Sequence, residues 1–374
     1  MENKEKLASV ASEELTGEEF EDLLRVGVDA AEKERGGTYI QKDHSVVRAT
    51  ILQEGIEILS IGEALQKYSW LEQYWWKAVS PGEDDPRTIS GEEKGYYIRV
   101  LPGVKSIFPV QACLYIASEG LVQNVHNIVI VEEGAELDVI TGCASGRHVV
   151  SGMHVGISEF YIKKNAKLNF TMIHNWAEKV AVQPRTGTVV EEGGVFLSNY
   201  VCMHPVDKLE MYPTTYLIGR GSTARYHTIL IGHPNSRMDV GSRVVLRGED
   251  SRAEILARSI TMGGYIVNRG HLVGEAPGVK GHLECRGLML APEGVIHAIP
   301  ELEARAEGVD LSHEAAVGKI AQEEIEYLMA RGLSEDEATA TIVRGFLNVK
   351  VMGLPAELEA EIERAIGLSD ESSM

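Results

Sequence analysis

The sequence predicts a mainly β protein with a β-solenoid core and α-helical segments at both ends. Residues 96–312 consist of short runs of Val, Ile, Leu, Tyr and Thr that alternate with polar residues and are interrupted by Gly or Asn. A turn motif recurs in this region every 28–31 residues. Before and after it, apolar residues follow helical spacing instead.

The N-terminal region, residues 1–95, is expected to be helical. Residues 12–34 form an acidic amphipathic stretch, and residues 55–78 carry regularly spaced apolar side chains that run into an aromatic cluster. We interpret both stretches as packing helices. The charged segment 80–86 contains two prolines and a glycine, which predicts a loop before the first strand of the core.

The repeated motif in residues 96–312 is an apolar residue, a polar pair, Gly or Asn, a small residue and an apolar residue. Its copies begin at Val131, Ile162, Val190 and Ile218, so they are 31, 28 and 28 residues apart. Gly and Asn tolerate the left-handed backbone of a tight corner. One corner per turn fits a solenoid, in which each turn buries its inner face by stacking on its neighbours. A β-sandwich with evenly spaced turns is the alternative.

The C-terminal region, residues 313–374, is expected to form a helical domain. Its first helix carries apolar residues on one face and ends at Gly332, a suitable C-terminal cap. Ser334 and Glu337 form a capping-box pattern that opens a second helix, and Pro355 is placed in the first turn of a third. Such helices either cap the solenoid or bind a partner, and the pattern alone favours capping.

The formal net charge of −20 is concentrated at the two ends of the 374-residue chain. Residues 1–35 and 301–374 hold 17 of the 20 net negative charges. We interpret the acidic ends as solvated helix faces, with an acidic binding surface as the alternative. The middle of the chain is nearly neutral, so nucleic acid is not an expected partner. No signal peptide is visible, and no apolar run approaches the roughly 18 residues that span a bilayer, so we expect a cytoplasmic protein without a membrane partner.

The four cysteines are widely separated and include no CxxC pair, which argues against a disulfide framework and a zinc knuckle. In a reducing cytosol they are expected to be thiols. The sequence contains no Walker, dinucleotide-binding, nucleophile-elbow or zinc-protease motif. We therefore expect a protein that binds no ATP itself and is not an enzyme.

Candidate ligands gather near the end of the predicted solenoid, where consecutive turns bring distant residues together. They are Cys285, His297, His313 and Glu314. Thiolate, imidazole and carboxylate groups are ligands for iron, zinc or an iron–sulfur cluster. Each residue also has a purely structural explanation. Cys285 fits a small core residue, His297 a hydrogen-bonded histidine of the solenoid, and His313 with Glu314 the start of a helix.

A second candidate group lies earlier in the solenoid. Cys143 follows a predicted strand and is flanked by small residues that leave its sulfur accessible. His174 and Trp176 place an imidazole and an indole at the end of another strand. They either line the solenoid interior or complete its core.

Taken together, several segments resemble the SufB/SufD proteins of iron–sulfur cluster assembly. The segment from Asp310 to Leu347 looks like the C-terminal signature of that family, and Glu284-Cys-Arg-Gly-Leu-Met-Leu290 resembles the segment that bears the essential cysteine of SufB. Shorter likenesses lie at residues 101–104, 130–134, 141–143 and 173–176. The resemblance covers about residues 55–350.

The resemblance implies a right-handed parallel β-helix, over residues 96–312, that pairs with a second SufB/SufD-type subunit. It also implies that the C-terminal helices, residues 313–350, dock a SufC-type ABC ATPase. In this family, ATP-driven SufC dimerisation is thought to twist the β-helices and expose the interface where a transient 2Fe–2S or 4Fe–4S cluster is built. Whether a reduced flavin joins the complex is left open.

Site residues follow from the same resemblance by motif. Cys285 is implied to be the cluster thiolate, His313 the interface histidine, and Glu314 the carboxylate that SufB has and SufD usually lacks. Cys143 matches the cysteine where sulfur enters. Trp176 lies along the β-helix interior between the two cysteines.

Three departures suggest a short, archaeal-type relative. His174 stands where SufB generally has Gln, the long N-terminal extension with a CxxC pair is missing, and residues 315–319 are closer to SufD. We therefore expect a homodimer with two ATPases. A thiolate at a subunit interface suits a transient cluster, because the site opens when the two chains shift. Neighbouring imidazolium or oriented amides would lower the pKa of Cys285 and favour its thiolate.

Two other functions compete with the scaffold interpretation. A β-helix polysaccharide lyase or hydrolase needs clustered acids or bases along an exposed groove, and the core sequence shows no such pairing. A SufD-like structural partner would keep the fold without a cluster site of its own. Cys285 together with Glu314 argues against that second alternative.

Overall fold

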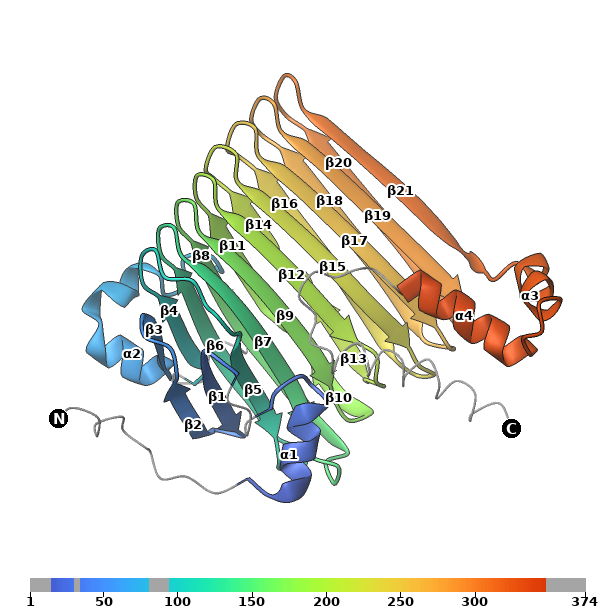
Figure 1. Cartoon of the computed structure of the whole chain (residues 1–374), viewed down its shortest axis with the longest axis horizontal. Helices are drawn as coiled ribbons and strands as arrows, with labels where there is room; N and C mark the ends of the chain where they lie inside the picture. The colour runs from blue at the N-terminus through green and yellow to red at the C-terminus, as the bar shows by residue number, and fades with distance from the viewer. Residues whose placement is uncertain (1–14, 30–33, 81–93, 348–374) are drawn as a thin grey trace.

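The computed structural model describes residues 15–29, 34–80 and 94–347, and it shows a β-solenoid of about eight turns with helices at both ends (Figure 1). The predicted fold class is confirmed. Neighbouring strands of the core run parallel and follow one another turn after turn, so the β-sandwich alternative is wrong.

Two long sheets form the walls of the solenoid, and we call them sheet A and sheet B. All their neighbouring strands are parallel except the pairs β1–β2 and β3–β4. Sheet A contains, in spatial order, β2 (Ser45–Ile51), β1 (Gly37–Lys42), β5 (Val110–Ile116), β7 (Glu136–Ser145), β9 (Lys167–Asn175), β12 (Val195–Cys202), β15 (Thr223–Gly232), β17 (Arg252–Thr261), β19 (Lys280–Met289) and β21 (Asp310–Lys319).

Sheet B has shorter strands in the middle of the solenoid, where one turn contributes two of them. Its strands, in chain order, are β3 (Ile56–Ser60), β4 (Tyr96–Val100), β6 (Val122–Val131), β8 (Ser151–Ile162), β10 (Lys179–Val182), β11 (Arg185–Val190), β13 (Lys208–Met211), β14 (Thr214–Leu217), β16 (Arg237–Leu246), β18 (Tyr265–Gly274) and β20 (Val295–Ala304).

The corners predicted from the repeat motif are present. Gly134, Asn165, Gly193 and Gly221 all have positive φ, between 56° and 69°. Each backbone N–H donates to a carbonyl at the corner of the next turn, for example Gly134 N to Lys164 O at 2.9 Å. The motif therefore marks a column of stacked corners, and the left-handed backbone explains why Gly or Asn recurs there.

The prediction that residues 1–95 are helical is wrong for residues 37–60, which form β1, β2 and β3. Ile56 and Ile58 are both buried and lie on one face of a strand, so their spacing has period two. A helix begins only after Ser60, whose side chain and backbone pair with Glu63 in a capping box. The described helices in this region are α1 (Gly17–Leu24), α2 (Ile61–Lys67) and the 3-10 helix η1 (Ser69–Gln73).

A buried carboxylate fastens the segment after η1 to sheet B. Glu159 on β8 is fully buried and accepts hydrogen bonds from the backbone N–H groups of residues 76–79, at 2.6 to 3.2 Å. His126 contacts the same carboxylate at 2.8 Å, and Trp75 stacks on the His126 ring at 3.8 Å between centroids. The predicted aromatic cluster does pack here, with Trp75 and Trp76 against His126 and Tyr74 against Tyr161.

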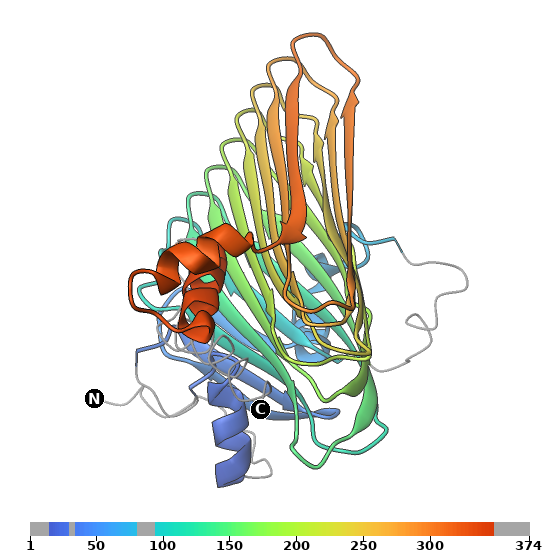
Figure 2. The same cartoon turned by 90° about the vertical axis from the view of Figure 1, so that its right-hand side faces the viewer.

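The helical C-terminal domain begins later than predicted, because residues 313–319 belong to strand β21. Two helices follow, α3 (Gln322–Met329) and α4 (Glu335–Leu347), and they stand off the end of β21 (Figure 2). Gly332 has a φ of +100°, and Ser334 and Glu337 form the predicted capping box. The helix predicted from Pro355 lies outside the described residues.

Apolar residues of both ends of the chain cover the outer face of sheet A. Leu23 of α1 and Val343 and Leu347 of α4 belong to one buried cluster with Ile173 and Ile229 of the sheet. Within residues 15–29, 34–80 and 94–347, no helix is long and apolar enough to cross a membrane.

Candidate functional site

Cys285 lies on β19, one strand from the open end of the solenoid, and its side chain faces the interior. It is 1% exposed and belongs to the main hydrophobic core. Burial raises the pKa of its thiol to about 11, and the nearby Glu284 carboxylate acts in the same direction while Arg258 opposes it. The expectation of a lowered pKa is wrong, because burial disfavours the thiolate and exceeds the opposing effect of Arg258.

His313 and Glu314 lie next to β19 on the last strand of sheet A, β21. His313 is in register with Leu283, and Glu314 is in register with Glu284. Side chains in register on parallel strands point to the same face. His313 therefore shares the inner side with Cys285, whereas Glu314 lies on the outer face, and both are exposed because no strand follows β21 within the described residues.

The fourth predicted ligand, His297, lies on β20 in the opposite sheet. Its neighbour Ile296 belongs to the core, so His297 points outward from sheet B, and it is exposed. The open end of the solenoid thus carries all four predicted residues, but they point to three different surfaces. Only Cys285 and His313 share a side.

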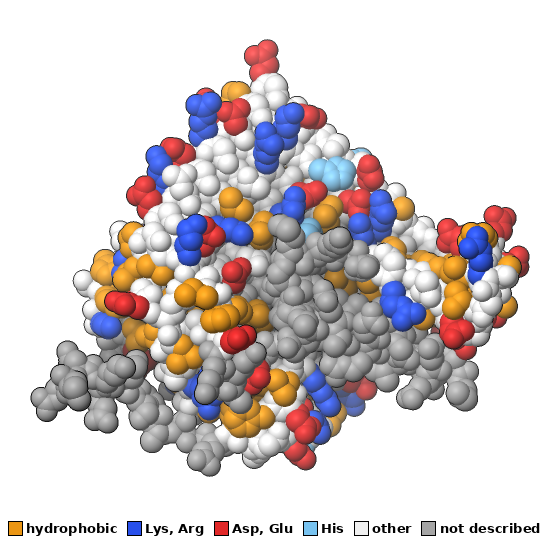
Figure 3. Space-filling view, in the orientation of Figure 1, with side chains coloured by type: hydrophobic (Ala, Val, Ile, Leu, Met, Phe, Trp, Pro, Cys, Tyr) orange, Lys and Arg blue, Asp and Glu red, His pale blue; other side chains and the backbone are white. Residues whose placement is uncertain are grey.

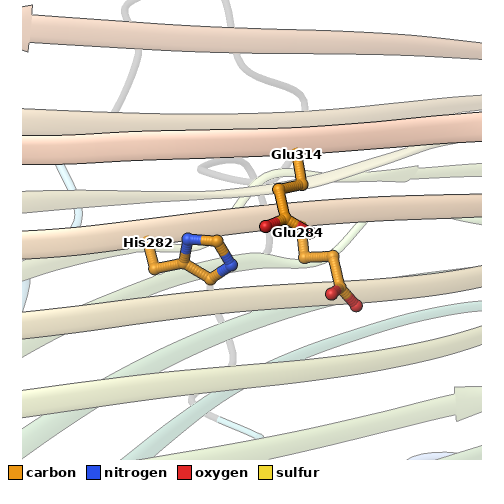
Figure 4. A group of neighbouring side chains, drawn as sticks. All are labelled: His282, Glu284 and Glu314. Atoms are coloured by element: carbon orange, nitrogen blue, oxygen red, sulfur yellow. The ribbon is translucent and has the colours of Figure 1, made fainter.

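A different group comes together on the outer face of sheet A. His282, Glu284 and Glu314 each offer a ligand atom, and these atoms all lie within 4.8 Å of one another (Figure 4). His282 and Glu284 are two residues apart on β19, and Glu314 is the register partner of Glu284. Imidazole and carboxylate donors suit a divalent cation such as iron. Sequence reasoning missed His282 and Glu284, although their alternation with the core residues Leu283 and Cys285 was a readable signal.

The second candidate group forms a column inside the solenoid. Cys143, His174 and Cys202 occupy register-matched positions on β7, β9 and β12, and each is at most 2% exposed. Burial raises the pKa of Cys143 and of Cys202 to about 12. The expectation of an accessible Cys143 sulfur is therefore wrong for this structure, and Cys202 is a member of the column that sequence reasoning did not single out.

Histidine and indole groups beside this column are buried without full hydrogen bonding. Tyr200 Oη lies 2.8 Å from His174 Nδ1, while His174 Nε2 and Trp176 Nε1 have no hydrogen-bond partner among the residues that the structure describes. Burial lowers the pKa of His174 well below its ordinary value and that of His154 to about 4. The interior is thus a neutral, weakly polar environment at physiological pH.

The buried His154 makes stability depend on pH. The folded protein resists protonation of this ring until about pH 4, whereas the unfolded chain binds the proton below about pH 6.5. His154 therefore does not reduce the free energy of unfolding above about pH 6.5. Between pH 7 and 4.5 it lowers that free energy by about 2 kcal/mol. Urea unfolding of His154→Gln should show a smaller loss over this range than the wild type. His297→Gln, an exposed control, should follow the wild type, and equal losses in all three proteins would contradict the assignment.

Comparison with known proteins gives consistent matches over nearly the whole chain. The family model described as the SufBD core domain of SUF system FeS cluster assembly matches residues 114–346. An iron–sulfur cluster assembly SufBD family protein of Methanothermobacter thermautotrophicus is 50% identical over 356 residues, which cover 93% of this chain and 87% of that protein.

Proteins of other organisms are also similar. A SufBD family protein of Archaeoglobus fulgidus is 50% identical over 356 residues, covering 95% of this chain and 96% of that protein. One from Staphylococcus haemolyticus is 30% identical over 362 residues, covering 94% of this chain and 77% of that protein. The likeness therefore extends well beyond residues 114–346, which the family model matches.

Proposed function

The chain belongs to the SufBD family of iron–sulfur cluster assembly proteins, and we propose that it is a scaffold subunit on which the SUF machinery builds a nascent cluster. It acts in the cytoplasm, where thiols stay reduced. A separate SufC-type ATPase supplies the energy.

The observation that carries this proposal is the position of Cys285 at the open end of the solenoid. The last strands, β20 and β21, each pair with a strand on one side only within the described part of the chain. Unpaired edges are templates for another chain. A second copy of this chain meeting these edges would bring two sets of Cys285 and His313 together, and the cluster would form between them.

Because Cys285 is buried, it must be exposed before a cluster can be built, and the ATPase would drive this change. In the isolated chain the thiol is 1% exposed and protonated, with a pKa of about 11. Cluster building needs an exposed thiolate. Movement of the last turn, driven by the ATPase, would expose Cys285 to solvent and to iron, and the site would close again around a cluster held by few ligands.

The α3–α4 hairpin is the proposed ATPase docking element, within residues 313–350. The hairpin packs against the outer face of sheet A through Val343 and Leu347 of α4, whereas α3 buries none of its residues. The exposed surface of the hairpin presents both hydrophobic and acidic side chains (Figure 3). Tyr327 on α3 is 58% exposed and Met329 41% exposed. Aromatic anchors of this kind carry much of the energy of protein interfaces.

Replacing Tyr327 by Glu should weaken ATPase binding by more than about tenfold, because a central aromatic contact contributes about 2 kcal/mol or more. The fold should persist, since the Tyr327 side chain is mostly exposed and its hydroxyl accepts a hydrogen bond from Arg331 in the turn after α3. Affinity is measured by calorimetry with the purified ATPase. Tyr212→Glu, at an exposed tyrosine on a loop of sheet B, is the control and should bind normally.

The scaffold function is tested by anaerobic reconstitution of the chain with its SufC-type ATPase, ATP, ferrous iron and sulfide. Visible and Mössbauer spectra report the cluster and distinguish 2Fe–2S from 4Fe–4S forms. We expect a cluster that transfers to an apo-ferredoxin. A chain that gains no cluster under these conditions would instead be a SufD-like structural partner, a role that the deep burial of Cys285 also fits.

A further inference from the structure

The strand alternation of β19 separates two kinds of donor atoms by the thickness of sheet A. Leu283 and Cys285 face the hydrophobic core, whereas His282 and Glu284 face outward. Glu314 on β21 lies beside Glu284 on the outer face. The carboxylate and the thiol expected to share one site are therefore on opposite faces.

The three outward side chains are arranged to hold one ion. Their ligand atoms lie within 4.8 Å of one another, and they come from two strands in fixed register (Figure 4). Ser312 Oγ lies 2.9 Å from His282 Nδ1, which leaves Nε2 for a ligand bond. A hydrogen bond to the other ring nitrogen is the usual way in which a metal-binding histidine is oriented.

Glu284 is the buried member of the group. It is 9% exposed, and within the described part of the chain Arg258 lies against its Oε1 as an ion-pair partner. Arg286 contacts the other oxygen at 3.1 Å. The two arginines thus compete with any cation for this carboxylate.

We propose that His282, Glu284 and Glu314 form a ferrous-ion loading site on the outer face of sheet A, separate from Cys285. The proposal rests on the scaffold function. One imidazole and two carboxylates form a donor set that suits Fe²⁺ and leaves coordination positions open. Without a thiolate, the ion is held weakly enough to be passed on.

The competing arginines make Fe²⁺ binding at this site respond to an arginine substitution, which a simple acidic patch would not do. An incoming Fe²⁺ must take Glu284 away from Arg258 or Arg286. Arg286 is about half exposed, so its removal should disturb the sheet little. Arg286→Gln should therefore tighten Fe²⁺ binding, because one competitor is lost and one positive charge is removed from the neighbourhood.

The test is anaerobic calorimetric titration of the full, cluster-free chain with Fe²⁺ alone. We expect Glu314→Gln and His282→Gln to weaken binding at least about tenfold, the range found even for residues that only support metal ligands. Arg286→Gln should strengthen it. Glu293→Gln, at an exposed carboxylate on the following corner, and His297→Gln should bind as the wild type does.

Cys285→Ser separates this inference from the scaffold function. Because the thiol faces the core, this variant should bind Fe²⁺ normally without sulfide. Loss of Fe²⁺ binding in Cys285→Ser, or unchanged binding in Glu314→Gln, would overturn the separate loading site. Neither result would decide whether a cluster forms, which the reconstitution with sulfide measures independently.

Discussion

Cys285→Ser is expected to lose cluster reconstitution completely while keeping the fold. Cys285 is the cysteine of the last turn, and serine offers a hydroxyl that binds iron poorly at neutral pH. The substitution is nearly isosteric, so the core around Leu283 should remain packed. The measurement is the visible absorbance and Mössbauer spectrum after anaerobic reconstitution with ATPase, ATP, iron and sulfide.

The matched control is Cys113→Ser. Cys113 is equally buried but lies on β5, in the apolar cluster on the outer face of sheet A, far along the solenoid from the last turn. It should keep its cluster. If Cys285→Ser forms as much cluster as the wild type, the assignment of Cys285 as the cluster thiolate is wrong.

The largest expected effect on stability is that of Glu159→Gln. Burial by itself would raise the pKa of Glu159, but hydrogen bonds from His126 and from backbone N–H groups lower it below its ordinary value. The carboxylate is thus charged and fully engaged. The amide of the introduced Gln would either point its N–H₂ group at these N–H donors or leave some of them without an acceptor. Losing a buried charged partner in this way lowers the free energy of unfolding by about 3–5 kcal/mol.

Chemical unfolding followed by tryptophan fluorescence measures this loss, because Trp75 and Trp76 surround His126 in the same cluster. Glu57→Gln is the control: Glu57 is half-buried and accepts from the hydroxyls of Tyr68 and Tyr97, so its loss should cost about 1 kcal/mol. A change below about 1 kcal/mol for Glu159→Gln would show that the anchor contributes little. In the wild type the Glu159 contribution is present above its ordinary pKa and is lost only in stronger acid.

The solenoid could be predicted because its corners are local. Left-handed backbone at Gly134, Asn165, Gly193 and Gly221 demands residue types that are visible in the sequence, and their spacing sets the turn length. The sequence did not predict the strands β1 to β3, because short apolar runs fit the spacing of a helix as well as that of a strand. The alternation of Ile56 and Ile58 continues into a helix after Ser60, and the capping box at Ser60 was the available signal.

The site was predicted by composition but not by geometry. Cys285, His313 and Glu314 do lie on neighbouring strands, as a turn of about 30 residues requires. Which face each occupies depends on strand phase, and a shift of one residue reverses it. The grouping of Glu314 with His282, and the burial that raises the pKa of Cys285, both follow from that phase and from neighbours that no local pattern specifies.

The stacked corners also bear on how such a chain changes length. The backbone N–H of each of these corner residues donates to a carbonyl of the adjacent turn, so the contacts of one turn are repeated by the next. Duplication or loss of one complete repeat of 28–31 residues would preserve every corner bond and the inward phase of the strands. The distance between the Glu159 anchor and the Cys285 end is therefore adjustable in whole-turn increments, whereas an insertion of a few residues must be accommodated outside the strands.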